Sequence, residues 1–209
     1  MNMFKSNIAC RTLLLMNLLL MFCMINVDAQ RLEVHANKDF SSNTIASKAW
    51  GVGGAIDFDQ WVKHITFRAN FNWAAYRPKD DNKHHDYQRL CGGISSFYSH
   101  KVGDKINVHG GIELNYTHLT HAYLYQQPDT VIIKGKATRQ IGDFIGLGVH
   151  VGASYKLRPR LNIVLNIIPT YLIMVSTKSS TPEVKPEYKK GIWMFPIQLG
   201  LSYQLYKPD

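Results

Sequence analysis

The chain has 209 residues, of which 45% are hydrophobic, 11% aromatic and 19% charged, and its formal net charge is +9. This apolar content excludes a globally disordered chain, and three cysteines are too few for a disulfide-stapled fold. The one apolar run long enough to consider as a membrane helix lies at the N-terminus, so a helical membrane bundle is not expected.

Residues 1–29 have the pattern of a cleaved export signal. Lys5 and Arg11 provide a positive start, a run of Leu, Met, Ile and Phe follows, and small or short side chains precede Gln30. The run is short for a helix that crosses about 30 Å of hydrocarbon. We therefore expect cleavage, export, and a mature domain of residues 30–209; an uncleaved membrane anchor is the alternative.

The rest of the chain alternates between apolar and small or polar side chains with a period of two, which is typical of β-strands with one apolar face. Between Phe144 and Tyr155, for example, one face carries Ile, Leu and Val while the other carries Gly, His and Ser. This alternation predicts eight strands. They cover residues 31–38, 49–58, 64–76, 87–98, 105–117, 144–155, 159–173 and 191–205.

The connections between these strands alternate in length. Short connections are predicted at residues 59–62, 100–104 and 156–159. Longer ones are predicted at residues 77–86, 118–142 and 175–190, and residues 41–44 join the first two strands. Antiparallel strands in up-and-down order satisfy this alternation, because the tight turns then share one end of a barrel and the long loops share the other.

The polar face distinguishes a soluble barrel from a transmembrane one. A water-facing exterior needs many Lys and Glu, but here the charges are nearly limited to Asp57, Arg68, Arg89 and Glu113. An eight-stranded barrel leaves an interior just wide enough for side chains, and aromatic residues near the strand ends suit interfacial girdles. We predict an all-β, eight-stranded antiparallel up-and-down transmembrane β-barrel; a secreted soluble ligand-binding barrel is the alternative.

With its signal, strand parity and loop asymmetry, the chain resembles the small eight-stranded outer-membrane barrels of Gram-negative bacteria, of the OmpX and OmpA-transmembrane-domain type. The resemblance covers residues 31–209. It implies residence in the outer membrane of a Gram-negative bacterium, contact with outer-membrane lipid and lipopolysaccharide, and insertion by the barrel assembly machinery.

Two features depart from that family. Residues 207–209 follow the aromatic residues that usually close the last strand. Pro169 and Pro196 lie within the last two predicted strands, where each removes a hydrogen-bond donor from the ladder. We expect a β-bulge near the long-loop rim to accommodate them.

Five polar side chains are predicted to face the lumen. Because unpaired buried charges are costly, we expect a hydrogen-bonded ion-pair network. Its members are Arg68, Arg89, His109, Glu113 and His150. The chain has no Walker signature, CxxC pair or HExxH motif, and we expect no catalytic residue, metal or cofactor. An exported protein without a basic-aromatic groove is also not expected to bind nucleic acid.

The predicted function is structural or adhesion-type, through extracellular loops that contact a host or cell-surface ligand. The best candidate contact surface lies in residues 118–142 and includes Tyr123, Tyr125, Ile132 and Ile133. The alternative is a membrane-embedded lipid-modifying enzyme. That alternative requires His118 to lie beside a serine and a carboxylate at the outer rim.

Overall fold

The computed structural model describes residues 31–42, 46–62, 64–78, 86–124, 137–180 and 190–205, so the expected signal at 1–29 lies outside the described residues. The described chain forms nine β-strands. They are β1 (Arg31–Ser41), β2 (Ala46–Val62), β3 (Ile65–Pro78), β4 (Asp86–Val102), β5 (Ile106–Leu124), β6 (Ala137–Arg158), β7 (Leu161–Ile167), β8 (Thr170–Ser179) and β9 (Gly191–Gln204). No described helix is long and apolar enough to cross a membrane.

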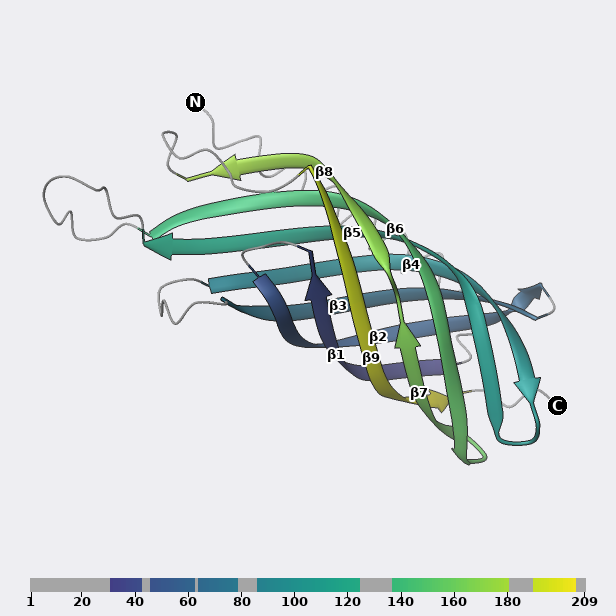
Figure 1. Cartoon of the computed structure of the whole chain (residues 1–209). Helices are drawn as coiled ribbons and strands as arrows, with labels where there is room; N and C mark the ends of the chain where they lie inside the picture. The colour runs from purple at the N-terminus through teal and green to yellow at the C-terminus, as the bar shows by residue number, and fades with distance from the viewer. Residues whose placement is uncertain are drawn as a thin grey trace, which may run out of the picture.

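The strands close into a single antiparallel barrel (Figure 1). Neighbours in the chain pair with one another, and β1 pairs with β9 to complete the circle. Both β7 and β8 lie between β6 and β9, where they occupy one position in the wall one after the other. The nine segments therefore build eight strand positions, and the predicted eight-stranded barrel is confirmed.

The break between β7 and β8 falls at Ile168 and Pro169. The amide of Ile168 donates to the Pro196 carbonyl (3.0 Å), and the Pro169 carbonyl accepts from the amide of Val149 (2.9 Å). Pro169 has no amide hydrogen, so the wall uses its carbonyl and interrupts the strand. The prediction of one continuous strand over 159–173 is wrong here. A register shift between Asp143 and Phe144, opposite Met174 and Ser176 of β8, lies near the long-loop rim but away from both prolines. Pro196 instead keeps its register opposite Asp39 and accepts a hydrogen bond through its carbonyl.

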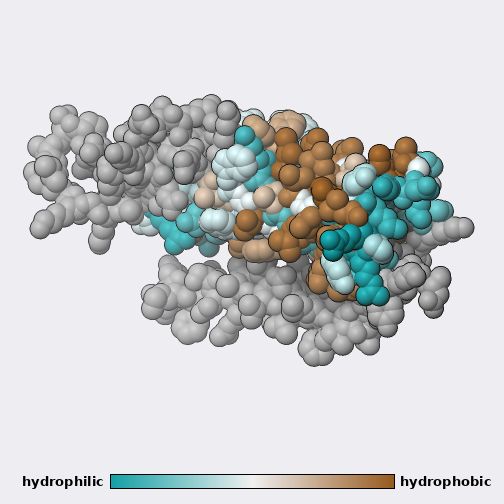
Figure 2. Space-filling model, turned by 90° about the horizontal axis from the view of Figure 1, so that it is seen from below, coloured by the Kyte–Doolittle hydropathy of each residue, from teal (hydrophilic) through white to brown (hydrophobic). Residues whose placement is uncertain are grey.

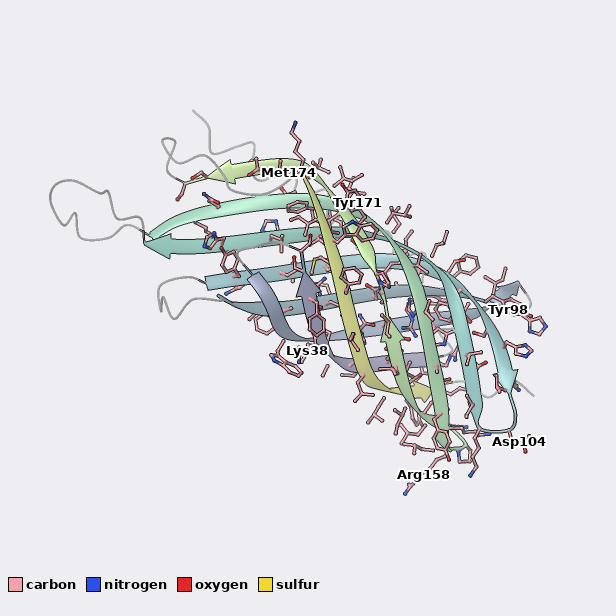
Figure 3. All side chains as sticks on the ribbon, in the orientation of Figure 1. Lys38, Tyr98, Asp104, Arg158, Tyr171 and Met174 are labelled. Carbon is pink, nitrogen blue, oxygen red and sulfur yellow. The ribbon has the colours of Figure 1, made fainter. Side chains whose placement is uncertain are left out.

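The hairpin of β5 and β6 is longer than predicted. The two strands stay paired as far as Leu124 opposite Ala137, so most of the predicted loop 118–142 is β-structure. The prediction ended the strands early because the apolar face stops near Tyr116 and Ile145, while the ladder continues beyond it. The tight turns lie at the opposite end, where Figure 3 shows Asp104 and Arg158. One of these turns uses Gly103 at a φ of 78°.

The apolar side chains face outward and the polar ones face inward. On β6, Val149 is 53% exposed, while the adjacent His150 is fully buried. Leu199 on β9 is likewise exposed, and its neighbour Gln198 is buried. Figure 2 shows the hydrophobic side chains gathered along the middle of the barrel wall. The soluble alternative required these side chains to line a cavity, whereas they form a lipid-facing belt typical of transmembrane barrels.

Exposed aromatic side chains lie near both margins of the belt. Tyr98 is at the tight-turn side, and Tyr171 is on β8 toward the other side (Figure 3). The Tyr171 and Trp193 rings are 5.1 Å apart. The Lys38 ammonium lies 4.7 Å from the centre of the Trp50 ring. A cation over an indole at the margin suits the headgroup region, where an aromatic ring is partly in lipid and partly in water.

Adjacent glycines on β5 give a matched test of the close-packed wall. A Cβ on Gly111 would lie 2.0 Å from the Ser96 carbonyl oxygen and 2.5 Å from the Phe97 Cα, whereas a Cβ on Gly110 would have no neighbour nearer than 3.9 Å. We expect Gly111→Ala to lower the unfolding free energy by about 1–3 kcal/mol, because backbone atoms have to move. Gly110→Ala is the control. Urea unfolding in lipid vesicles measures both, and equal effects would contradict this packing.

Candidate functional site

Arg68 is the centre of a buried ion cluster in the half of the lumen nearer the tight turns. Its Nε donates to Asp57 Oδ1 (2.6 Å), and its Nη2 donates to Asp57 Oδ2 (3.0 Å) and to Glu33 Oε2 (2.7 Å). Arg31 Nε lies 3.6 Å from Asp57 Oδ2. The guanidinium thus binds two carboxylates at once, which its planar array of donors permits.

Amide and imidazole side chains extend this cluster across the barrel. Glu33 Oε1 lies 3.1 Å from His35 Nδ1, and His35 Nε2 lies 2.6 Å from Asn72 Oδ1. Asn166 donates to Glu33 (3.2 Å), and Gln198 donates to Asn72 (3.2 Å). These contacts join β1, β3, β7 and β9, so polar side chains span the interior from wall to wall.

The five residues predicted for the lumen all lie inside the barrel, but in separate groups. Arg89 Nη2 is 2.6 Å from Asp39 Oδ2, whereas Glu113 accepts from Asn70 (2.9 Å) and Asn115 (3.1 Å).

The two histidines of the predicted set lie near each other. His109 Nε2 lies 2.8 Å from Asn166 Oδ1, and its ring is 5.3 Å from the ring of His150. His150 Nδ1 is 3.9 Å from Glu113 Oε2. Asn166 links His109 to the Arg68 cluster through Glu33, whereas Arg89 pairs with Asp39.

Sequence reasoning missed the inward face of β1. Glu33, His35, Asn37 and Asp39 are all buried in the lumen, and two of them are the carboxylate partners of the predicted arginines. Their strict alternation with the outward-facing Leu32, Val34 and Ala36 is a signal that could have identified them.

Apolar side chains fill the lumen toward the long loops. The cluster is inward-facing and consists of Ala49, Ala74, Tyr87, Leu119, Phe144, Leu172, Ile192 and Met194. Two cavities inside the described barrel measure about 10 Å³ each, which is room for no more than a single water molecule. Buried polar side chains and this apolar cluster thus occupy the described lumen.

A second polar group lies on the outside of the wall, at the upper margin of the belt. Asp143 accepts hydrogen bonds from the Tyr116 hydroxyl (2.6 Å) and the Ser176 hydroxyl (2.6 Å), and His118 Nδ1 lies 2.7 Å from the same carboxylate. We call these four residues the rim cluster. The lipid-facing run of β6 begins at Ile145, so the carboxylate lies just beyond it.

The hydrogen bonds of the rim cluster stabilise an ionised carboxylate. Burial alone would raise the pKa of Asp143, but the hydrogen bonds from Ser176 and Tyr116 and the contact with His118 outweigh it and hold this pKa below its ordinary value of 3.8. At neutral pH the site therefore carries a fixed negative charge that is enclosed by donors.

The rim cluster contains the three types of group that the lipid-modifying alternative requires. His118 does lie beside a carboxylate and a serine, as that alternative requires. However, Ser176 donates to Asp143, whereas a nucleophilic serine needs the imidazole as its base. The geometry therefore orders the three groups differently from a hydrolase triad.

The predicted loop contacts lie mostly outside the described residues. Tyr123 is within β5, opposite Thr138. Tyr125, Ile132 and Ile133 are not among the described residues.

The family model described as "Protein of unknown function (DUF3575)" matches residues 14–205. The chain belongs to the DUF3575 family. No curated protein sequence matches it.

Solved structures show that this DUF3575 protein has the fold of small bacterial outer-membrane barrels. Neisserial surface protein A is 14% identical, with 84% of this chain and 96% of that chain covered and a TM-score of 0.54. A major outer membrane protein from Thermus thermophilus is 16% identical, with 85% and 100% covered and a TM-score of 0.58. Ail, the attachment invasion locus protein of Yersinia pestis, is 8% identical, with 86% and 100% covered and a TM-score of 0.51.

Proposed function

We propose that this DUF3575 protein is an integral outer-membrane barrel with a structural or adhesion-type role at the cell surface, and neither a pore nor an enzyme. The observation that carries the proposal is a lipid-facing belt around a filled lumen. We therefore do not expect solutes to pass through the described part of the lumen. The barrel acts instead through what it presents above the membrane.

The β5–β6 hairpin supports a surface role. Beyond Ile145 the paired strands continue to Ala137, which at about 3.3 Å per residue amounts to roughly 25 Å of strand above the belt. The chain that links the two strand ends includes Tyr125, Ile132 and Ile133, and Tyr123 lies within β5. Tyrosine and isoleucine presented there could form the apolar part of a contact surface.

A polyanionic glycan is one candidate class of ligand. Ail has been solved in complex with the heparin analogue sucrose octasulfate, and it shares this fold at 8% identity with a TM-score of 0.50. The present chain carries 24 Lys and Arg against 15 Asp and Glu. An excess of positive charge favours encounter with sulfate or phosphate groups.

Two further parts of the proposal concern assembly. Residues 1–29 act as the export signal and residues 30–209 as the barrel domain. The barrel assembly machinery then inserts the chain beside lipopolysaccharide in the outer membrane of a Gram-negative bacterium. The alternating strands and the aromatic residues near the C-terminus support this route.

Replacing residues 125–136 by a short Gly-Ser turn tests the adhesion role. We expect the variant to fold, because the ladder below the loop is intact, and to lose most of the binding of intact cells to host-cell or glycan-coated surfaces. Heat-modifiable gel mobility measures folding, and counts of bound cells measure adhesion. The matched control shortens residues 79–85. Unchanged adhesion in the 125–136 variant, or equal loss in both variants, would argue against the proposal.

A further inference from the structure

The outer wall above the belt is graded from apolar to polar to basic. Ile145 and Ile173 face each other on β6 and β8 and are exposed at the top of the belt. In the next row, His118, Asp143 and Ser176 are direct register partners across β5, β6 and β8. Above them Lys178 lies opposite Ile141.

A bulge in β8 creates this grading. Phe144 pairs with Met174, but Asp143 pairs with Ser176, so Val175 is an extra residue in β8. The bulge turns Ser176 outward toward Asp143, although the preceding alternation would have turned it inward. The following residues continue from the new register, and Lys178 is exposed on the outer face.

Arg139 completes the basic part. It is exposed, and it lies two residues beyond Ile141 on the outward face of β6. Its amide donates to the Ser180 hydroxyl (2.9 Å), and its carbonyl accepts from the Ser180 amide (2.9 Å). The distance along the strand from Asp143 to Arg139 is four residues, or about 13 Å.

We propose that this wall, from Ile145 and Ile173 through the rim cluster to Lys178 and Arg139, binds one lipopolysaccharide molecule through its lipid A. The order of the three layers matches that lipid. Acyl chains would lie on the isoleucines, the sugar hydroxyl and amide groups would meet the rim cluster, and phosphate would meet the two cations. The proposal rests on membrane residence alone and is independent of adhesion.

The rim cluster is suited to hydrogen-bond an uncharged sugar. The negative charge of Asp143 is not expected to repel an anionic lipid strongly. Three groups surround the Asp143 carboxylate, so its charge is partly offset before any ligand arrives. The contact through Nδ1 leaves His118 Nε2 as the ring nitrogen available to a ligand, and the side chain is 34% exposed.

A charge-reversal pair tests the proposal on purified, folded protein in neutral detergent. The probes are bisphosphorylated lipid A and phosphatidylglycerol, with affinity measured by native mass spectrometry. We expect Arg139→Glu with Lys178→Glu to weaken lipid A binding at least about tenfold, since each cation near anionic headgroups contributes substantially. The matched control is Lys156→Glu with Arg158→Glu, which makes the same charge change at the tight-turn end of β6 and is expected to leave the affinity within about twofold.

Two further arms make the outcome decisive. His118→Leu with Ser176→Val is expected to weaken lipid A binding and to leave phosphatidylglycerol binding unchanged. If the charge-reversal pair does not fold, Arg139→Gln with Lys178→Gln replaces it. Equal affinity for the two lipids in the wild type would overturn the assignment to lipid A. The site would be overturned if the Arg139–Lys178 pair and the Lys156–Arg158 control pair lost equal lipid A affinity, or if neither lost any. None of these measurements depends on cell adhesion, so failure of the loop experiment does not affect them.

Discussion

Replacing Arg68 with methionine is expected to lower the free energy of unfolding by about 3–5 kcal/mol, because the change removes one partner of a buried ion cluster. Asp57 and Glu33 would remain in the lumen, and Asp57 would keep Arg31, whose Nε lies 3.6 Å from its Oδ2. Their other polar contacts come from neutral groups or from His35. A carboxylate without its partner inside a barrel is far costlier than one in water.

A triple variant separates charge from packing. Arg68→Met combined with Asp57→Asn and Glu33→Gln removes all three charges while keeping side chains of similar size. We expect it to regain most of the lost stability, because neutral groups replace an unbalanced cluster. Urea unfolding and refolding in lipid vesicles, followed by tryptophan fluorescence, gives the free energies.

Two results would contradict this account. A loss of less than about 1 kcal/mol for Arg68→Met would mean that water reaches the cluster. A triple variant as unstable as the single one would mean that the arginine acts by filling space, for example against the Phe97 ring, whose centre lies 5.2 Å from Cζ.

The alternation of side chains predicted the barrel and its orientation. Each strand separates lipid from lumen, so neighbours such as Val149 and His150 face different solvents and the pattern appears directly in the sequence. The same reasoning placed the turns between β4 and β5 and between β6 and β7 to within a few residues. The turn predicted at 59–62 was placed too early, because β2 continues to Val62 and β3 begins at Ile65. These features are local, and a single sequence is enough to show them.

The partners inside the lumen could not be predicted in the same way. Arg68 meets Glu33, which is 35 residues away, and Asn166 donates to Glu33 from 133 residues away. Which side chains meet depends on the stagger between neighbouring strands, and that stagger is a property of the closed barrel. The sequence therefore indicated which residues face inward, but not how they pair.

The rim cluster was hidden by a local irregularity. Thr170, Leu172 and Met174 face inward, so a strict period of two would turn Ser176 inward as well. The bulge at Val175 reverses this and brings Ser176 to Asp143. The extension of β5 to Leu124 was missed for a related reason, because above the lipid the outward face is no longer uniformly apolar and the strand loses its sequence signature.

Replacing Val149 with arginine is expected to destabilise the barrel in a bilayer by about 2–4 kcal/mol. Val149 lies near the middle of the outward apolar run of β6, which extends from Ile145 to Tyr155, and its partner on β5 is the exposed Ile112. A guanidinium at this depth loses its hydration and has few polar partners. Unfolding free energies measured in lipid vesicles give the effect.

Leu157→Arg is the matched control, because Leu157 is also exposed on the outward side of β6 but lies beyond Tyr155 at the tight-turn end. There the arginine can reach headgroups and water, so we expect a cost of about 0–1 kcal/mol. In detergent micelles, where the apolar layer deforms more easily, the difference between the two variants should shrink. If Val149→Arg and Leu157→Arg cost the same in vesicles, the apolar belt does not face lipid, and the outer-membrane role and the lipid A site would both lose their foundation.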